Sequence, residues 1–302
     1  MNNYGCFEKK RLWTYKMKKL GVIANCRKPN ASLVLSALEK DAAEAGLTLL
    51  TDPDTGNMLK SAKITDNDSL FTEAEAIMAL GGDGTMIKVV RQMKEHNKPI
   101  IGVNIGALGF LTSVAADELN IAIKCLVAED FKISRRSILT GSIIRDGKTI
   151  SSYSALNDIV ITRESSIRLI TLDVEIDNED VTSYRCDGLI ISTPTGSTGH
   201  SMSAGGPIVM PETKVFVMSI ICPHTLSSRP LVLTDSSHIR ISTARNKTKL
   251  LITADGQIGQ PLESGDQIEI EKSNKDVQLI TLPDHSYFSV LRHKLGWRGS
   301  AI

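Results

Sequence analysis

The sequence predicts an α/β domain with a parallel sheet, followed by a domain built almost entirely of β-strands. Two observations support this order. In residues 18–130, short apolar runs alternate with segments of helical period, which is typical of a parallel sheet with helices on its faces. After about residue 130, apolar residues recur with a period of two, which is typical of strands. We therefore expect a domain boundary near residue 130.

The elements of the first domain follow from these apolar patterns. Residues 31–46 have helical spacing, and Gly46 is placed to end that helix as a C′ residue. Pro99 precedes the last strand-like run. The expected strands cover residues 20–24, 47–50, 76–80 and 100–105, and the expected helices cover 31–46, the stretch after Thr85 as far as Met93, and 118–127.

The second domain, expected over residues 131–282, shows strand periodicity and turn signals. Asp146-Gly147 separates two strand-like runs and predicts a hairpin, and Gly265-Asp266 predicts a turn before a strand. No long helical pattern occurs between about residues 130 and 280. Helical spacing returns only in the last twenty residues, so we expect residues 283–302 to pack back on the first domain. The alternating apolar positions are Leu172, Val174 and Ile176, Ile239 and Ile241, and Ile268 and Ile270.

Composition narrows the class of protein. Hydrophobic residues are 41% and charged residues 23% of the 302 positions, which is enough to bury a core and argues against disorder. The net charge of +1 and the 4% of aromatic residues argue against sequence-independent nucleic-acid binding. No run approaches the roughly 20 apolar residues of a membrane helix. We expect a soluble, globular protein that binds neither nucleic acid nor membrane.

The net charge is unevenly distributed. Six cationic residues against Glu8 give residues 1–19 a charge of +5, so the other 283 residues sum to −4. No apolar stretch of the kind that follows the basic residues of a secretory signal is present. We interpret residues 1–17 as a disordered basic tail, or as the product of a start codon assigned too early, in preference to a partner-binding arm.

The cysteines indicate neither a disulfide framework nor a structural zinc site. There are five of them, an odd number, and no Cys-x-x-Cys pair occurs. A reducing cytoplasm is therefore the expected location.

The first motif with chemical content is Gly81-Gly82-Asp83-Gly84-Thr85. It lies where a parallel strand ends and a helix begins, which is where open α/β sheets bind ligands. Glycines let the backbone approach a ligand, and the N–H groups of the first helical turn suit phosphate. A carboxylate beside such a cradle repels anions unless it takes a proton or helps to hold a metal. The alternative is a tight turn in which Asp83 is an ordinary helix cap.

A second polar cluster follows an apolar strand. Asn157-Asp158 is a polar pair inside another apolar stretch and needs hydrogen-bond partners from the protein or from a ligand. Hydroxyl groups and bare amides suit ribose and phosphate oxygens, although runs of this composition are also ordinary loops. The hydroxyl residues of the cluster are Ser192, Thr193, Thr195, Ser197, Thr198 and Ser201, and Ala204-Gly205-Gly206-Pro207 comes after them.

With these motifs in order, residues 18–299 resemble the bacterial-type NAD kinases. Gly81–Thr85 matches the family's GGDGT, which lipid kinases share, and the longer matches are more specific. The resemblance implies a Rossmann-like first domain, a β-sandwich-like second domain and homodimers or homotetramers built through the β-rich domain. The longer matches are residues 102–112, Asn157-Asp158, residues 187–198, 203–207 and 222–226, and Leu295-Gly296-Trp297-Arg298-Gly299.

The resemblance also implies a reaction and a set of site residues. The reaction is transfer of phosphate from ATP, accompanied by Mg²⁺ or another divalent cation, to the 2′-hydroxyl of the adenosine ribose of NAD, giving NADP and ADP. Asp83 would be the general base, Gly81, Gly82 and Thr85 would complete the phosphate loop, and Arg185 and Asp187 would act within one chain or from a neighbouring subunit. No protein-built metal cage and no tightly bound prosthetic group is expected. The residues carried over as NAD-binding are Asp83, Gly84, Lys88, Asn157, Asp158, Arg168, Arg185, Asp187, Thr198, Gly199, His200, Ser201, Met202, Ser203 and Gln257.

One position departs from the family pattern. The family usually has Ser-Thr-Ala-Tyr where this chain has Ser197-Thr198-Gly199-His200. An imidazole stacks on a base less extensively than a phenol ring and can titrate, so the preference between NAD and NADH stays open, as does the range of phosphoryl donors. Two rival hypotheses are a lipid kinase, which would not explain residues 187–198, and a non-catalytic dinucleotide sensor, against which the intact Asp83 argues.

Overall fold

The computed structural model describes residues 17–106, 108–164, 168–246 and 249–297. The predicted tail, apart from Met17, lies outside these residues, as do Arg298 and Gly299 of the last motif. Met17 is buried against the first strand and so belongs to the core. Within the described residues, no helix combines the length and apolar character needed to cross a membrane.

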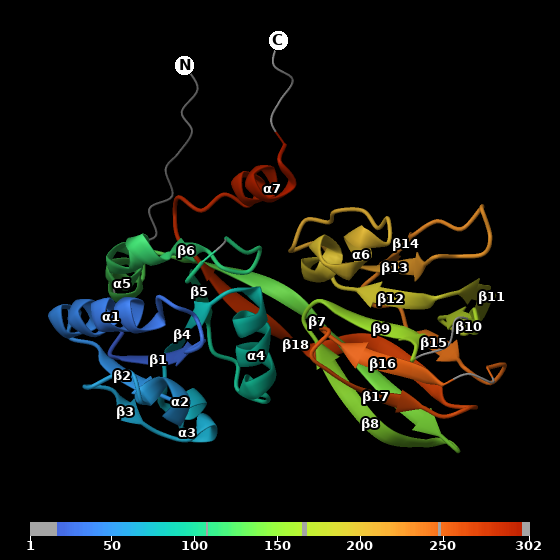
Figure 1. Ribbon diagram of the computed structural model, residues 1–302, viewed down its shortest axis with the longest axis horizontal. Helices are drawn as coiled ribbons and strands as arrows, with labels where there is room; N and C mark the ends of the chain where they lie inside the picture. Colours follow the sequence, from blue (N-terminus) through green and yellow to red (C-terminus); the bar gives the residue numbers. More distant parts are fainter. Residues whose placement is uncertain (1–16, 107, 165–167, 247–248, 298–302) are drawn as a thin grey trace, which may run out of the picture.

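The first lobe is a parallel sheet, as the alternating pattern predicts, and its strand order is β3-β2-β1-β4-β5 (Figure 1). Its strands are β1 (Lys19–Ala24), β2 (Thr48–Thr51), β3 (Lys63–Ile64), β4 (Ala76–Gly81), β5 (Ile100–Asn104) and β6 (Val114–Ala115). Its helices are α1 (Ala31–Ala45), α2 (Pro53–Gly56), α3 (Asn67–Glu73), α4 (Asp83–Met93) and α5 (Leu119–Ala128), with a 3₁₀ turn, η1 (Ala116–Glu118).

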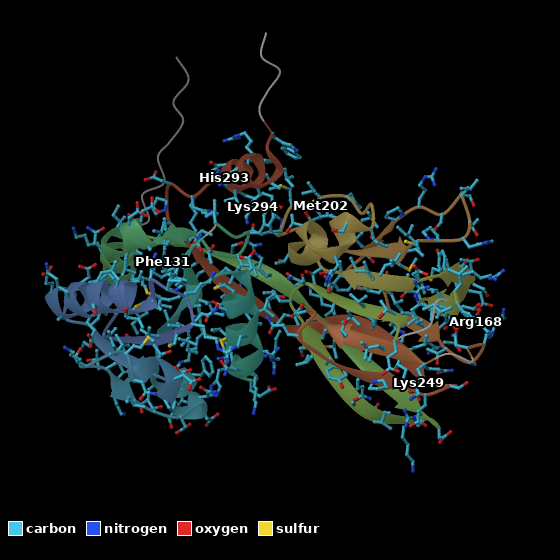
Figure 2. All side chains as sticks on the ribbon, in the orientation of Figure 1. Phe131, Arg168, Met202, Lys249, His293 and Lys294 are labelled. Carbon is cyan, nitrogen blue, oxygen red and sulfur yellow. The ribbon has the colours of Figure 1, made fainter. Side chains whose placement is uncertain are left out.

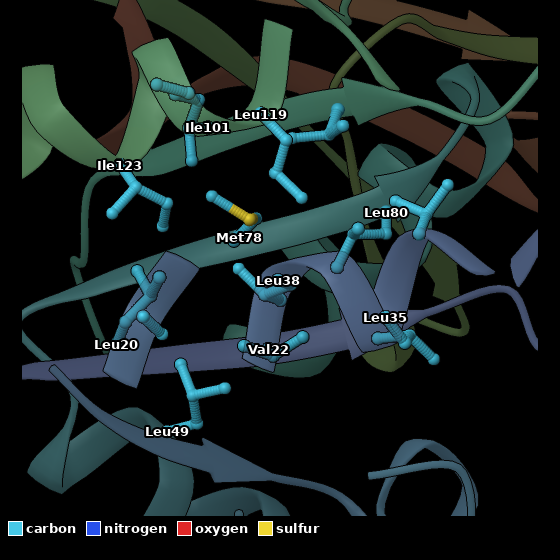
Figure 3. Packing of buried hydrophobic residues seen from close by; sticks show 14 of the residues in the cluster. Leu20, Val22, Leu35, Leu38, Leu49, Met78, Leu80, Ile101, Leu119 and Ile123 are labelled. Carbon is cyan, nitrogen blue, oxygen red and sulfur yellow. The ribbon is translucent and has the colours of Figure 1, made fainter. Parts of the chain in front are cut away.

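Helices cover both faces of this sheet because successive strand residues point to opposite sides. Val22 of β1 and Met78 of β4 point to the side of α1 and α5, where Leu35 and Leu38 pack over them (Figure 3). Ile23, which follows Val22 in β1, packs on the opposite side of the sheet. Ile77, which precedes Met78 in β4, packs there with it. Burying one such side chain contributes about 1.5–3 kcal/mol, so the two apolar layers hold the carboxyl ends of β4 and β5 in place.

The second lobe is a sandwich of two antiparallel sheets. One sheet contains β7 (Lys132–Arg145), β8 (Lys148–Ala155), β10 (Ile170–Ile176), β11 (Glu179–Cys186), β15 (Ile239–Ser242) and β18 (Gln267–Thr281). The other has the order β14-β13-β12-β9-β16-β17, formed by β9 (Asp158–Arg163), β12 (Gly188–Ser192), β13 (Val215–Ile221), β14 (Leu231–Thr234), β16 (Leu250–Ala254) and β17 (Ile258–Leu262). The inward-facing residues of both sheets, among them Leu172, Ile241 and Phe216, form one buried cluster.

The two lobes share a sheet, because β18 leaves the sandwich and pairs with β5 in parallel through Leu279 and Ile100. Its long antiparallel partner β7 accompanies it, and both strands cross between the lobes in Figure 1. The predicted hairpin at Asp146-Gly147 joins β7 to β8, with positive φ at both residues.

Three short elements complete the fold: η2 (Thr195–Thr198), α6 (His200–Ser203) and α7 (Tyr287–Leu295). The last of these is the predicted C-terminal helix. It contacts the first lobe as expected, since the Lys294 ammonium lies 6.0 Å from the centre of the Phe110 ring.

Candidate active site

Asp83 lies at the start of α4, directly after the carboxyl end of β4. Gly82 is the N-cap residue and its carbonyl accepts hydrogen bonds from the amides of Thr85 and Met86. Gly81 must be a glycine, because a Cβ there would lie 2.1 Å from Thr85 Oγ1. The predicted phosphate loop is therefore a tight strand-to-helix turn with its helix N-terminus open to a cavity.

The carboxylate of Asp83 is fixed by the loop that follows β5. Asp83 Oδ2 accepts the amide of Phe110 and Oδ1 accepts the amide of Leu111, both at 2.9 Å. Gly109 lets the loop come this close, since a Cβ on it would lie 2.0 Å from Oδ1. Each oxygen keeps a second lone pair for another donor, so Asp83 is oriented and still able to accept a proton.

A cavity of about 830 Å³ opens in front of α4. Three cationic side chains line it, Arg27 and Lys28 from the loop after β1 and Lys88 from α4, together with residues 82–85. Two carboxylates, Asp54 and Asp83, also line it. Helix N–H groups and ammonium or guanidinium groups around one cavity are the donors that phosphate groups require. Arg27 and Lys28 escaped the sequence prediction because no motif marks them.

Asn157 and Asp158 stand at the start of β9 and are held by the turn between β16 and β17. The carboxylate of Asp255 in that turn accepts the amides of Leu156, Asn157 and Asp158 at 3.0, 2.6 and 3.2 Å. Burial raises the pKa of Asp255, and these three bonds together with the charge of Arg91 oppose the rise. These three bonds fix the backbone of the polar pair, and of its two side chains that of Asp158 contacts a protein group, His200.

Asp158 and His200 form the contact that joins β9 to α6. Asp158 is 1% exposed, and its Oδ1 lies 3.3 Å from His200 Nδ1. Burial raises the pKa of Asp158, while His200 lowers it and Asp255 adds to the rise. The imidazole is mostly exposed and lines a second cavity of about 630 Å³. Most of this cavity is apolar, with Val160, Ile190, Ile220, Ile221 and Pro223 among its walls.

The hydroxyl-rich loop differs from its prediction. Most of its hydroxyls bond to the protein: Thr193 to the Leu156 carbonyl, Ser197 to the Pro194 carbonyl and Ser201 to Ser219. Gly196 packs on the backbone of Asn157, where a Cβ would lie 2.1 Å from the carbonyl oxygen. These residues shape the floor under Asn157 and do not present a row of free hydroxyls. Ser203, by contrast, lines the apolar cavity, and Met202 lies beside it on α6 (Figure 2).

Three predicted residues lie elsewhere on the second lobe. Arg168 and Arg185 are exposed, Arg185 on the edge strand β11, and Figure 2 shows Arg168 at the far end of the sandwich from α4. Asp187 is paired with Arg163, with contacts of 2.7 and 3.1 Å. Within a single chain these three side chains are therefore not brought together with Asp83.

Gln257 lies close to the start of α4, as its prediction requires. Its Nε2 donates to the Gly84 carbonyl at 3.1 Å, and its Oε1 accepts from Arg91 at 2.7 Å. Arg91 was not predicted from the sequence, because nothing in the pattern of α4 separates it from an ordinary exposed helix residue.

Two family models match the chain, the ATP-NAD kinase N-terminal domain over residues 20–131 and the ATP-NAD kinase C-terminal domain over residues 156–282. An NAD kinase of Syntrophotalea carbinolica is 39% identical over 282 residues, which are 93% of this chain and 99% of the relative. An NAD kinase of Gemmatimonas aurantiaca is 38% identical over 93% of this chain and 96% of its own.

Solved structures agree with these matches. The yeast NADH kinase in complex with NADH has a TM-score of 0.87 and 25% identity, covering 96% of this chain and 91% of its own. An NAD kinase of Archaeoglobus fulgidus in complex with ATP has a TM-score of 0.72 and shares the fold at 23% identity, covering 93% of this chain and all of its own. The chain belongs to the ATP-NAD kinase family, and it is an enzyme of that family.

Proposed function

We propose that the protein transfers the γ-phosphoryl group of ATP to the 2′-hydroxyl of the adenosine ribose of NAD, with Asp83 as general base. The observation that carries this proposal is the Asp83 carboxylate. It is held by the amides of Phe110 and Leu111 on the wall of a cationic cavity, and it keeps lone pairs for an incoming hydroxyl. A base that is oriented by a third group is the arrangement that activates a nucleophile.

ATP is assigned to the cavity of about 830 Å³. Arg27, Lys28 and Lys88 supply positive charge, and the first turn of α4 supplies N–H groups. This local charge matters because the chain outside its first 19 residues is acidic overall. Phosphoryl transfer depends chiefly on positioning and on neutralising charge, which is what these groups provide. The A. fulgidus enzyme of the same fold is in complex with ATP, which is consistent with ATP as the phosphoryl donor.

NAD is assigned to the other side of Asp83, across Asn157, Asp158 and the apolar cavity lined by His200. The complex of the related yeast enzyme with NADH supports a dinucleotide as a substrate of this chain. We place Arg168, Arg185 and Asp187 at this site as contributions from a neighbouring subunit of a homodimer or homotetramer. Arg168 and Arg185 are exposed, which is compatible with that role, whereas Asp187 is half-buried and paired with Arg163.

The proposed reaction is a direct displacement. The 2′-oxygen of the ribose forms a bond to the γ-phosphorus as the bond from that phosphorus to the β,γ-bridging oxygen breaks. Asp83 accepts the hydroxyl proton, and ADP leaves with the electrons of the broken bond. A positioned base of this kind contributes typically 10²–10⁴-fold in rate.

A divalent cation fits this site only as a companion of ATP. Among the described residues there is no group of three His, Cys, Asp or Glu side chains that could hold a metal ion. Mg²⁺ commonly binds through one or two carboxylates together with substrate phosphates and water, and Asp54 and Asp83 are the carboxylates that line the cavity. Bound there, the ion would neutralise charge on the phosphates.

The free thiols of Cys26, Cys125, Cys186 and Cys222 favour a reducing location, which we propose to be the cytoplasm.

Replacing the base tests the proposal. In Asp83→Asn the amide oxygen can still accept one of the two backbone N–H groups, whereas the carboxylate that takes the proton is gone. We expect kcat to fall by about 10²–10⁴-fold with little change in the KM for ATP. The measurement is the initial rate of NADP formation from NAD, ATP and Mg²⁺ by purified protein. A wild type that makes no NADP would refute the kinase function, and an Asp83→Asn enzyme of full activity would refute the role of Asp83.

A further inference from the structure

The turn between β16 and β17 contacts both halves of the active site. Asp255 and Gly256 both have positive φ, 53° and 62°, which gives the turn a defined shape. On one side, the Asp255 carboxylate holds the amides of residues 156–158, and the Asp255 amide donates to the Asp158 carbonyl at 2.9 Å. Four hydrogen bonds therefore hold the turn against the segment that carries Asn157.

On its other side, the same turn is attached to α4 through Gln257. The side chain of Gln257 donates to the carbonyl of Gly84, the residue after Asp83, and accepts from Arg91. Gly84 and Arg91 are seven residues apart and so lie on the same face of the helix. Arg91 is thus the group that fixes the amide orientation in which Gln257 Nε2 faces Gly84.

We propose that Arg91 is a positioning residue which, through Gln257, sets the spacing between Asp83 on α4 and Asn157-Asp158 on β9. The proposal rests on the proposed function in one respect: the acceptor substrate must bind between Asp83 and the pair Asn157-Asp158. The cavity that we assign to ATP has no residue of this turn in its lining. Losing Arg91 should therefore disturb the acceptor and leave ATP binding unchanged.

The charge of Arg91 also acts on the turn directly. Arg91 is one of the groups that oppose the raised pKa of Asp255, so it favours the ionised carboxylate that accepts three amides. A lysine at position 91 would keep the charge, but it lacks the rigid fork of N–H donors that holds an amide oxygen in one orientation. Arg91→Lys should therefore retain part of the kcat/KM for NAD that Arg91→Ala loses.

The kinetic experiment compares Arg91→Ala, Arg91→Lys, Gln257→Ala and the double variant with the wild type. A matched control is Gln278→Ala, which removes another exposed amide contact, the 3.0 Å bond from Gln278 to Asn97, away from both cavities. For Arg91→Ala we expect kcat/KM for NAD to fall by about 10²-fold, as a 1 Å misplacement does. The KM for ATP should stay constant. The double variant should have the same kcat/KM for NAD as Arg91→Ala, because both substitutions remove the same chain of contacts from Arg91 through Gln257 to Gly84.

Two kinetic outcomes would overturn the proposal. If the losses of Arg91→Ala and Gln257→Ala multiply in the double variant, the two residues act independently. If the KM for ATP alone rises in Arg91→Ala, then Arg91 binds phosphate and does not position the acceptor site. The control should match the wild type in both constants.

A measurement on the ligand-free protein separates this proposal from the kinase function. Hydrogen exchange of the amides of residues 156–158 reports their bonds to Asp255. In Arg91→Ala these amides should exchange about tenfold faster than in the wild type, whereas the exchange rates of amides inside α4 should not change. In Gln278→Ala the amides of residues 156–158 should exchange at the wild-type rate. Unchanged exchange would refute the proposal. If the amides exchange faster in Arg91→Ala but the wild type makes no NADP, the kinase function is refuted and the attachment of the turn by Arg91 still stands.

Discussion

Gly109 shows how one residue without a side chain can control a catalytic group. The backbone after it donates two hydrogen bonds to Asp83, so both oxygens of the base are fixed from one side. The backbone of Gly109 does not have a positive φ, and an alanine could therefore adopt its conformation. The constraint on this position is the 2.0 Å approach of a Cβ to Asp83 Oδ1.

We accordingly predict that Gly109→Ala lowers kcat by roughly 10²-fold, because it displaces the Asp83 carboxylate by about 1 Å. The measurement is the rate of NADP formation at saturating NAD and ATP. A thermal unfolding curve serves as the check that the variant is folded. Adding the substitution to Asp83→Asn should cause no further loss. A Gly109→Ala enzyme as fast as the wild type would show that the position of Asp83 does not depend on this contact.

Single residues of the site were predictable from the sequence where a motif fixes a short stretch of backbone. The strand–glycine–helix pattern singled out Asp83 and the family resemblance singled out Lys88, and both residues line the cavity of about 830 Å³. Several hydroxyls of residues 192–201 bond to the protein, and the sequence could not reveal this, since composition does not show whether a hydroxyl faces a ligand or a nearby carbonyl. Arg91 was missed because its partner, Gln257, is 166 residues away.

At the scale of elements, long periodic segments were predictable and short ones were not. The helix expected over residues 31–46 is α1, which ends at Gly46 with a φ of 73°. The structure adds α2, β3 and α3, which the sequence did not indicate; they have four, two and seven residues, too few to establish a period. Each of the two helices begins with an aspartate cap, Asp52 and Asp66, and these caps are the signals that could have revealed them.

The strands of the sandwich depend on the cluster of side chains between its sheets. Phe216 of β13 is fully buried there, so Phe216→Ala removes a whole ring from a closed core. We expect this change to lower the free energy of unfolding by about 3–5 kcal/mol. Denaturant unfolding followed by circular dichroism is the measurement.

Phe288 on α7 provides a matched control, because its ring is 55% exposed. Phe288→Ala should change the free energy of unfolding by no more than about 0.5 kcal/mol. Equal losses for the two variants would mean that the sandwich core contributes no more to stability than the surface of α7.

For the molecule as a whole, the unpredictable feature is the way in which the two lobes are joined. Local patterns placed a boundary near residue 130, and the change from α/β to antiparallel structure does occur there. They could not show that β18, which begins in the sandwich, ends beside β5, because this pairing brings Leu279 next to Ile100. The shared sheet explains why the turn carrying Gln257 can act on α4: β18 pairs with β5 of the first lobe and with β7 and β15 of the sandwich.

The buried carboxylate of Asp158 predicts how the stability of the whole fold changes with pH. Burial raises its pKa above the ordinary value of 3.8, so the folded chain binds this proton more tightly than the unfolded chain does. Ionising Asp158 therefore costs folding free energy. The cost is absent below the ordinary pKa, grows as the pH rises through the raised pKa, and is complete above it.

Asparagine at position 158 cannot ionise and escapes this cost. We therefore expect the thermal midpoint of Asp158→Asn to rise relative to that of the wild type as the pH is raised from about 4 to about 7. Asp266→Asn is the opposite case, because the hydrogen bond from Arg145 lowers the pKa of Asp266 and its ionised form stabilises the fold. That variant should be less stable than the wild type by a nearly constant amount from about pH 4 to about 7, and the difference should shrink as the pH falls below the ordinary pKa of 3.8. If the two differences had the same slope with pH, burial would not be what sets the pKa of Asp158.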